Sequence, residues 1–196
     1  MVFSRVSIAA AGVAAMLAVS ACGGNPPDKE IQQAQGAIDT ARAAGASNYS
    51  PDEFAAAEGA LAKANAAVGQ HDYRQALSFA LDARDRAQTA VKDAVDRKAT
   101  ARADADRALR DADQALHGAG QKLKSLEGNR AMARAVASVR PMIDASEEGV
   151  KKARAAFDAG NYRDVPPQAK AVIERLRVAV HDLEAPPPAP ARSRRR

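Results

Sequence analysis

The chain has 196 residues, of which 27% are charged and only 4% aromatic, and it contains one cysteine, Cys22. A single cysteine excludes an internal disulfide, and the length allows one ordinary domain or two small ones. The net charge of +5 comes from Arg5 and from four arginines in residues 192–196, so the rest of the chain is near neutral. Nucleic-acid binding is therefore not expected.

The first predicted element is a signal peptide at residues 1–21. Arg5 precedes the mainly apolar residues 6–21, which end on small side chains directly before Cys22. This layout is typical of a secretory signal. Residues Val19-Ser20-Ala21-Cys22 resemble the lipobox of bacterial lipoproteins, in which the cysteine receives a diacylglycerol and becomes the first residue of the mature protein. The resemblance makes Cys22 the expected lipidation site and residues 22–28 a lipidated tether.

Two other interpretations of this segment are an uncut membrane anchor and an ordinary secreted protein. A membrane-spanning helix needs about 20 apolar residues, and this run is shorter and rich in alanine, so the lipid anchor is favoured. Each buried methylene contributes about 0.8 kcal/mol, so two or more acyl chains hold a protein firmly on a membrane. Gly23 differs from the aspartate that retains lipoproteins in the inner membrane of enteric bacteria. The outer membrane, facing the periplasm, is the expected location.

The remainder predicts an all-α protein, an elongated antiparallel bundle of two stacked helical hairpins. About a quarter of the residues are alanine, the best helix former, and no strand pattern is present. The first helix spans 31–45 and ends at Gly45. The second helix begins at Ser50, whose hydroxyl is expected to cap the helix in a capping box with Glu53. Its apolar residues 54, 61 and 68 have the seven-residue spacing of coiled coils.

Three further helices are expected. The third spans 72–117, is capped by Asp72 and carries an apolar row that ends at Val95 before it thins to alanines. Glycines and an asparagine in 118–129 mark a turn. The fourth helix spans 132–157 and should be kinked or restarted by Pro141. The fifth spans 164–183 with Asp164 as its cap, and the Pro- and Arg-rich tail at 185–196 is expected to be disordered.

A weak internal repeat at an offset of 89 residues divides the chain into hairpins at 29–117 and 118–184. Residues 61–68 align with 150–157, and residues 72–74 align with 161–163. Both copies read as a helix, a tight polar turn, an aromatic residue and a second helix. Two hairpins that cannot bury their faces alone would then stack into one bundle, although chance similarity between alanine-rich segments is the alternative.

Two segments, 43–54 and Asp72-Tyr73-Arg74-Gln75-Ala76, resemble bacterial lipoproteins containing domain of unknown function 4398. The family motif is an Ala-Gly-Ala turn followed by Tyr-Ala-Pro-x-Glu-Leu and later by Asp-Tyr-x-x-Ala. Here Ser50 replaces the alanine and Phe54 the leucine. The resemblance covers about 31–94 and implies a helical fold in the cell envelope, with no established activity. The second half of the chain does not clearly match this family.

No catalytic, cofactor-binding or metal site is predicted, and the chain is not expected to be an enzyme. The histidines, His71, His117 and His181, have no metal-binding spacing. Carboxylates instead stand four residues before cations, which is typical of a solvated helix face. These pairs are Asp82 with Arg86, Asp93 with Arg97, Asp106 with Arg110, Glu147 with Lys151, and Glu148 with Lys152.

Two further groups of residues have open interpretations. Tyr49, Tyr73 and Tyr162 stand at helix starts, where each ring is expected to close the end of a hairpin, with a ligand platform as the alternative. The arginine tail is a solvated end, or it is attracted to anionic envelope polymers or phospholipid.

The function expected from the sequence is that of a non-catalytic, lipid-anchored envelope protein, a structural or interaction module. Its expected partners are the membrane, through the lipid on Cys22, and an unknown envelope protein or peptidoglycan, with self-association through residues 72–117 as a further possibility. The alternative is a periplasmic adaptor that regulates an envelope enzyme through a tetratricopeptide-like hairpin groove.

Overall fold

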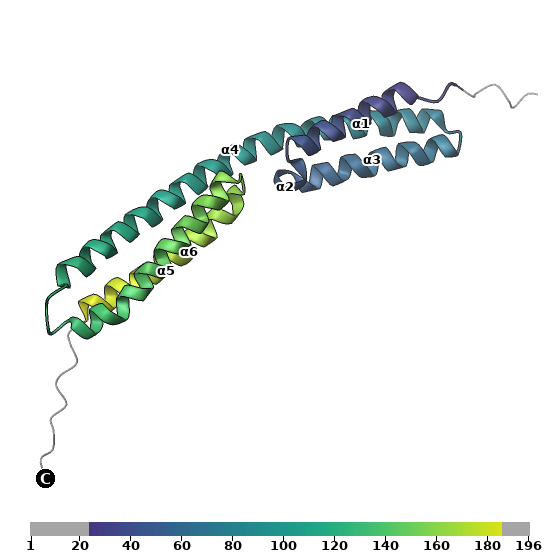
Figure 1. The fold of residues 1–196 in the computed structure, drawn as a ribbon. Helices are drawn as coiled ribbons and strands as arrows, with labels where there is room; N and C mark the ends of the chain where they lie inside the picture. The colour runs from purple at the N-terminus through teal and green to yellow at the C-terminus, as the bar shows by residue number, and fades with distance from the viewer. Residues whose placement is uncertain (1–23, 186–196) are drawn as a thin grey trace, which may run out of the picture. The chain divides into compact units, whose positions relative to one another are not determined.

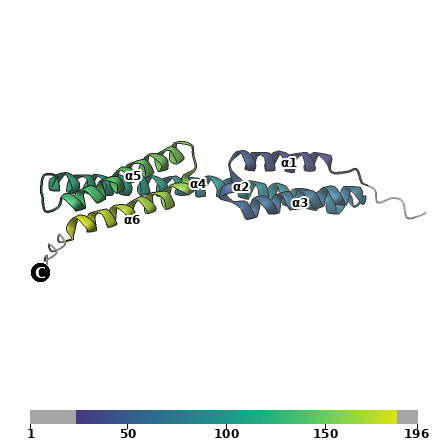
Figure 2. The same cartoon turned by 60° about the horizontal axis from the view of Figure 1, so that its bottom comes forward.

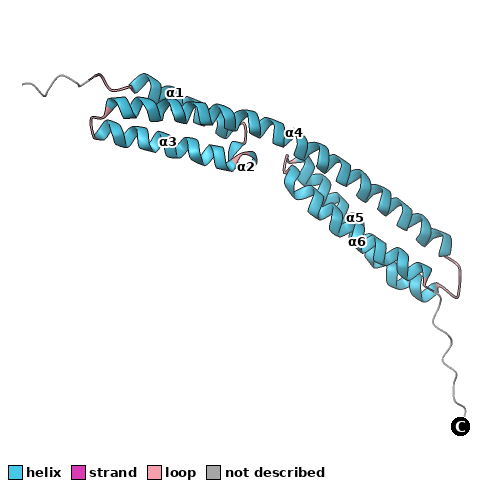
Figure 3. Cartoon of the chain, turned by 180° about the vertical axis from the view of Figure 1, so that it is seen from behind, coloured by secondary structure: helices cyan, strands magenta, loops and turns pink. Residues whose placement is uncertain are grey.

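The computed structural model describes residues 24–185, which are helical throughout apart from short turns (Figures 1 and 3). The described residues contain six α-helices and one 3-10 helix and no strand, so the all-α prediction is confirmed. The predicted signal peptide, the lipidation site Cys22 and residues 186–196 of the tail lie outside the described residues.

The chain divides into two compact units between Val95 and Asp96. The first unit contains the first part of α4 and three preceding helices, and the second unit contains the rest of α4 and the elements that follow it (Figures 1 and 2). The elements are α1 (Asp28–Ala43), α2 (Ala46–Tyr49), α3 (Pro51–Gly69), α4 (Tyr73–Leu126), α5 (Ala133–Asp158), η1 (Tyr162–Asp164) and α6 (Val165–Glu184).

The turn expected from residue 118 begins later, because α4 continues through Gly118 and Gly120 to Leu126. The predicted division after residue 117 therefore falls inside a helix. Each glycine costs a helix about 1 kcal/mol relative to alanine. Ala119 and Leu123 are buried in one apolar cluster with residues of α5 and α6, and this packing outweighs the cost.

The buried face of α4 follows a heptad pattern of small side chains. The residues of this pattern follow one another at intervals of four and then three positions. In the first unit all of them are alanines with no exposed surface, and in the second unit alanine alternates with leucine. Because alanine is short, a neighbouring helix can approach closely along such a row. The two rows are Ala76, Ala80, Ala83, Ala87, Ala90 and Ala94, and then Ala105, Leu109, Ala112, Leu116, Ala119 and Leu123.

Two residues predicted to belong to the apolar row of this helix are exposed instead. Leu77 is 39% exposed and Val95 is 55% exposed. Each lies one position after a buried alanine, and one helical position rotates a side chain by about 100° away from the buried face. From 95 to 104 no residue of α4 is buried, so the buried row is interrupted where the two units divide.

The predicted caps are only partly correct. Gly45 has the left-handed φ of +85° and follows the end of α1, as expected. Asp72 caps α4, since its Oδ1 accepts a hydrogen bond of 3.0 Å from the Gln75 N–H. Ser50 and Asp164 occupy N-cap positions, but neither side chain makes a capping hydrogen bond. Instead of joining a capping box, Glu53 lies 3.6 Å from Arg86 of α4.

The unpredicted helix α2 explains why Ser50 does not cap. This single turn starts directly after Gly45, and the Ser50 N–H donates to the Ala46 carbonyl at 2.8 Å. Ser50 is only 1% exposed, because α2 folds it into the unit together with the buried ring of Tyr49. The serine therefore serves as a packed residue between two helices.

The two turns related by the predicted repeat have the same backbone hydrogen bonds. In each, a residue with a left-handed φ, +61° at His71 and +80° at Gly160, donates to the carbonyl three residues earlier. The next residue donates to the carbonyl five residues earlier, which is the Schellman arrangement. The four bonds, all 2.9 Å long, join His71 to Val68, Asp72 to Ala67, Gly160 to Phe157 and Asn161 to Ala156. The two turns, which lie 89 residues apart in the sequence, therefore share a backbone structure as well as a sequence pattern.

In the second unit α5 and α6 pack closely along their length. Pro141 lies inside α5, which continues through it rather than restarting there. Val139 and Ile143, on either side of the proline, are buried in the cluster shared with α4 and α6. At Gly149 the helices are so close that an added β-carbon would lie 2.6 Å from Val172 Cγ2.

Candidate functional site

The one predicted site residue, Cys22, lies outside the described residues, so the structure adds nothing to its assignment. The structure shows the positions of the charged side chains, the histidines, the tyrosines and the hollows between helices. The possible functions of the folded part of the chain depend on these groups.

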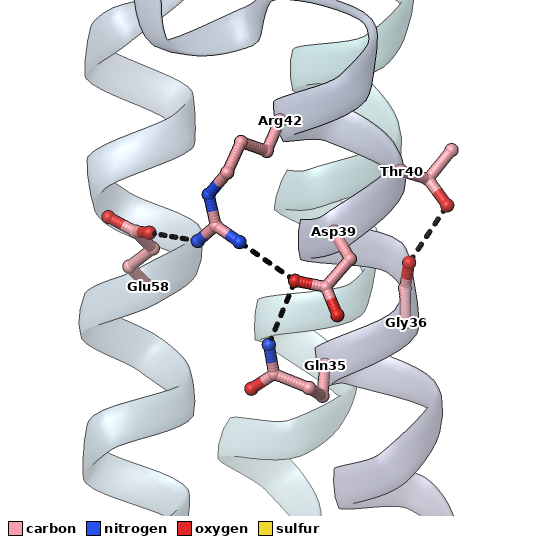
Figure 4. Close-up of polar contacts among 6 residues, drawn as sticks. All are labelled: Gln35, Gly36, Asp39, Thr40, Arg42 and Glu58. Carbon is pink, nitrogen blue, oxygen red and sulfur yellow. Dashed lines mark hydrogen bonds and ion pairs between the residues drawn. The ribbon is translucent and has the colours of Figure 1, made fainter.

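A network of charged side chains joins α1 to α3 in the first unit (Figure 4). The two terminal nitrogens of Arg42 each lie 2.8 Å from a carboxylate oxygen, one of Asp39 and one of Glu58. The guanidinium also lies 5.5 Å from the centre of the Phe54 ring. The hydrogen bond to Glu58, more than the one to Asp39, raises the pKa of Arg42 above its ordinary value. The Arg42 guanidinium therefore stays charged at neutral pH, and its pair with Glu58 bridges α1 and α3 at the surface.

Most of the predicted helix-surface pairs form. Asp82 binds Arg86 at 2.9 Å, Asp106 binds Arg110, and Glu147 binds Lys151 at 3.1 Å. The pairing of Glu148 was predicted wrongly, since it binds Lys151 at 2.9 Å instead of Lys152. On an α-helix, side chains three and four residues apart both lie close together. Spacing alone therefore cannot decide whether Glu148 pairs with Lys151 or Lys152.

Other ion pairs cross between helices, and no sequence spacing could have indicated them. They join elements of one unit at the surface, where a single pair contributes little to stability. They are Glu53 with Arg86, Asp113 with Arg154, Glu127 with Arg140, and Lys122 with Glu184.

The three histidines are exposed at the surface. His71 Nδ1 lies 3.0 Å from the Tyr73 hydroxyl, and His117 Nε2 lies 2.9 Å from Gln121 Nε2. His181 is largely exposed beside Asp182. Among residues 24–185, no group of three or more histidine, cysteine or acidic side chains is arranged to hold a metal ion.

The three tyrosines contact the helix ends at which they stand. Tyr49 is buried in the first unit, Tyr73 bonds to the neighbouring His71, and the Tyr162 ring packs on Phe157 with ring centres 5.1 Å apart. These contacts support the interpretation that the rings close the hairpin ends, because each ring is engaged by its own turn or by the adjacent helix.

A groove of about 750 Å³ lies between α4 and α6 in the second unit. Its apolar floor includes Ala115, Ala119 and Val180, and its charged rim includes Asp111 and Arg177. The hollow is open to solvent along the two helices. Its shape and lining suit a docked segment of polypeptide better than an enclosed small substrate.

A second hollow of about 570 Å³ lies at the turn between α4 and α5. Partly buried apolar side chains, among them Leu126 and Val136, line it together with Arg130 and Arg140. This hollow combines apolar surface with positive charge at one end of the unit.

None of the described helices has a stretch long and apolar enough to cross a membrane. Comparison with curated proteins and with solved structures gave no match. Residues 29–106 match the model of one protein family, described as "Domain of unknown function (DUF4398)". This match confirms the resemblance of the sequence to domain of unknown function 4398, and it covers α1, α2, α3 and the first part of α4. Residues 29–106 of this chain are therefore similar to this family.

Proposed function

We propose that the chain is a lipid-anchored protein of the bacterial cell envelope whose two helical units serve as a non-catalytic structural or interaction module. The anchor rests on the lipobox-like residues 19–22, in which Cys22 is the acceptor. The observation that best supports such a module is the distribution of apolar and charged side chains in each unit. Alanine and larger apolar side chains fill the interior of each unit, while charged groups form pairs on the surface.

Catalysis at neutral pH usually relies on titratable groups that converge in a cleft with shifted pKa values. The pKa is raised for three side chains that are already cationic at neutral pH, namely Arg42, Arg86 and Lys151. Hydrogen bonds to carboxylates cause these shifts, and all three side chains are partly exposed at the surface. Such side chains stabilise helices and keep the surface solvated, which supports a module that binds other components.

A second candidate is an adaptor that binds an envelope protein through the groove between α4 and α6. The groove favours this candidate because its open apolar floor, with a charged rim, is suited to a helical or extended segment. Ala119 is buried in the floor and Val180 is partly buried there. A charge placed at Val180 would interfere with docking. Because Val180 also packs against the core cluster, circular dichroism must show that the variant keeps its helix content.

The two candidates are separated by cross-linking in intact cells, followed by capture of the protein and mass spectrometry. The adaptor predicts one dominant partner that is lost in Val180→Glu but retained in Val178→Glu, a matched change at a site on α6 that is 52% exposed. The structural module predicts several abundant envelope neighbours or cell-wall fragments, unaffected by either change. Capture of only cytoplasmic proteins would contradict both candidates.

A further inference from the structure

Exposed apolar side chains gather on α4 in the first unit. Among the described residues three large apolar side chains are exposed, and two of them lie here: Leu77, which is 39% exposed, and Val95, which is 55% exposed. Each lies four positions from a partly buried apolar residue, Leu81 or Val91. Side chains four positions apart are neighbours on a helix, so α4 carries two apolar pairs that face solvent in part. The third exposed side chain, Val178 on α6, has only charged residues and a histidine at positions three and four away.

The two apolar pairs belong to one heptad row, which we call the outer row. Its members follow one another at intervals of four and three positions, each directly after an alanine of the buried row: Leu77, Leu81, Arg84, Gln88, Val91 and Val95. The outer row is therefore turned about 100° from the packed face and runs for about 27 Å along the helix. It points away from α3, because the contacts with α3 lie on the opposite flank of α4. There Phe79 meets Lys63, and Arg86 meets Glu53.

The outer row has the same pattern when it is followed from either end, with two apolar, two polar and two apolar residues. Members at equal distances from position 86 would therefore meet if the α4 helix of a second copy packed against it in the antiparallel direction. The facing residues would be Leu77 with Val95, Leu81 with Val91, and Arg84 with Gln88. Because a guanidinium donates hydrogen bonds to the side-chain oxygen of glutamine, the polar centre of such a pair is satisfied.

Other registers of two such helices fit less well. A parallel copy in register would place Arg84 beside Arg84, and like charges brought together at an interface are costly. A shift of one heptad, in either orientation, would place apolar side chains opposite Arg84 or Gln88. Polar residues within an apolar row select one register in coiled coils for this reason. The pattern therefore favours the antiparallel pair centred on position 86.

The charges near the centre of the outer row also suit this pair. Arg84 lies 2.9 Å from Asp85 on the same helix. A twofold axis at position 86 would bring two of these ion pairs together, so that each cation approaches an anion of the other copy. At the two ends exposed Arg74 would approach exposed Lys98, a repulsion that solvent and salt screen and that limits the interface to the outer row.

We propose that the outer row of α4 binds a second copy of this chain, in an antiparallel and twofold-symmetric dimer. Six positions on one helix bury less area than a standard interface, so the dimer is reversible, with a dissociation constant on the order of 10–100 µM. The dimer goes beyond the proposed function, because it requires neither the lipid on Cys22 nor the groove between α4 and α6. It would give an interaction module two copies of every other surface.

The first test is sedimentation equilibrium of residues 24–196, which keep every described helix and lack Cys22, over concentrations around the expected dissociation constant. Val95→Glu should weaken the dimer roughly tenfold or more, because the charge enters a partly apolar contact twice in each dimer. Val178→Glu is the matched control, since this valine is 52% exposed and lies outside the outer row. Unchanged helix content by circular dichroism shows that both variants are folded. A wild-type monomer at all concentrations, or equal effects of the two variants, would overturn the proposal.

The second test is cross-linking with a short bismaleimide, which measures the orientation of the two copies. Leu77→Cys and Val95→Cys chains should each fail to cross-link alone, because identical positions lie about 27 Å apart along an antiparallel pair. A mixture of the two chains should form a covalent dimer. Cross-linking of Leu77→Cys alone would show a parallel pair, and a mixture that stays monomeric would show that the outer rows do not meet; either result overturns the proposal.

Discussion

An added β-carbon at Gly149 of α5 would lie 2.6 Å from Cγ2 of Val172 of α6, closer than packed carbon atoms approach each other. The contact fixes how near these helices come, and Val172 is almost fully buried. Gly149 is therefore required by packing, although glycine is a poor helix former.

We expect Gly149→Ala to lower the free energy of unfolding by up to about 2 kcal/mol. Overpacking of a filled interior costs about 1–3 kcal/mol, and the roughly 1 kcal/mol gained in helix propensity offsets part of this cost. Urea denaturation followed by circular dichroism measures the change. Gly59→Ala in α3 is the control, since its β-carbon would meet nothing within 4 Å and should stabilise by about 1 kcal/mol. A stabilised Gly149→Ala protein would show that the helices can separate freely.

The alanine row of α4 should resist enlargement. Ala87 has no exposed surface, so Ala87→Leu has no room and is expected to destabilise the first unit by about 1–3 kcal/mol. Leu77, which is 39% exposed on the same helix, should tolerate Leu77→Ala within about 0.5 kcal/mol. Thermal unfolding of the two variants tests the pair, and equal effects would mean that the row does not define the packed face.

The equivalent turn residues His71 and Gly160 should respond in opposite ways. A left-handed φ costs a residue with a β-carbon about 1 kcal/mol relative to glycine, so Gly160→Ala is expected to destabilise by about that amount. His71→Gly should be neutral or stabilising by a few tenths to about 1 kcal/mol, because it loses only an exposed bond to Tyr73. Denaturation midpoints of both variants decide this, and marked destabilisation by His71→Gly would give the histidine a role beyond the turn.

On the alkaline side, the pairing of Lys151 should be lost only well above neutral pH. Its hydrogen bond to Glu148, followed by the one to Glu147, raises its pKa above the ordinary value of 10.5. A raised pKa contributes stability that is fully present below the unfolded value and disappears as the pH rises through the folded value. The stability difference between the wild type and Lys151→Gln should therefore be constant from about pH 6 to pH 9 and shrink above about pH 10.5. A difference that disappears near neutral pH would contradict the pairing.

Local signals in the sequence were sufficient for the helices and for several of their ends. Alanine content and spacing predicted the all-α class, Gly45 predicted the end of α1, and Asp72 predicted a cap that forms. The predicted repeat, at an offset of 89 residues, relates two turns that have the same backbone hydrogen bonds. These features depend on a few neighbouring residues, and such interactions can be read along the chain.

Features that depend on tertiary packing were missed. Gly118 and Gly120 were read as a turn because their helix propensity is low, but burial of Ala119 and Leu123 keeps α4 intact. Ser50 was read as a cap, whereas the unpredicted helix α2 buries it. The assignment of Cys22 rests on the sequence alone.

The central claim is a lipid on Cys22, and intact-mass spectrometry of the protein isolated from the membranes of its native host tests it most directly. We predict a mature chain that begins at Cys22 and carries the added mass of a diacylglycerol, and a Cys22→Ser chain that keeps its signal peptide and carries no lipid. A wild-type chain cut elsewhere, or one that begins at Cys22 without added lipid mass, would contradict the account.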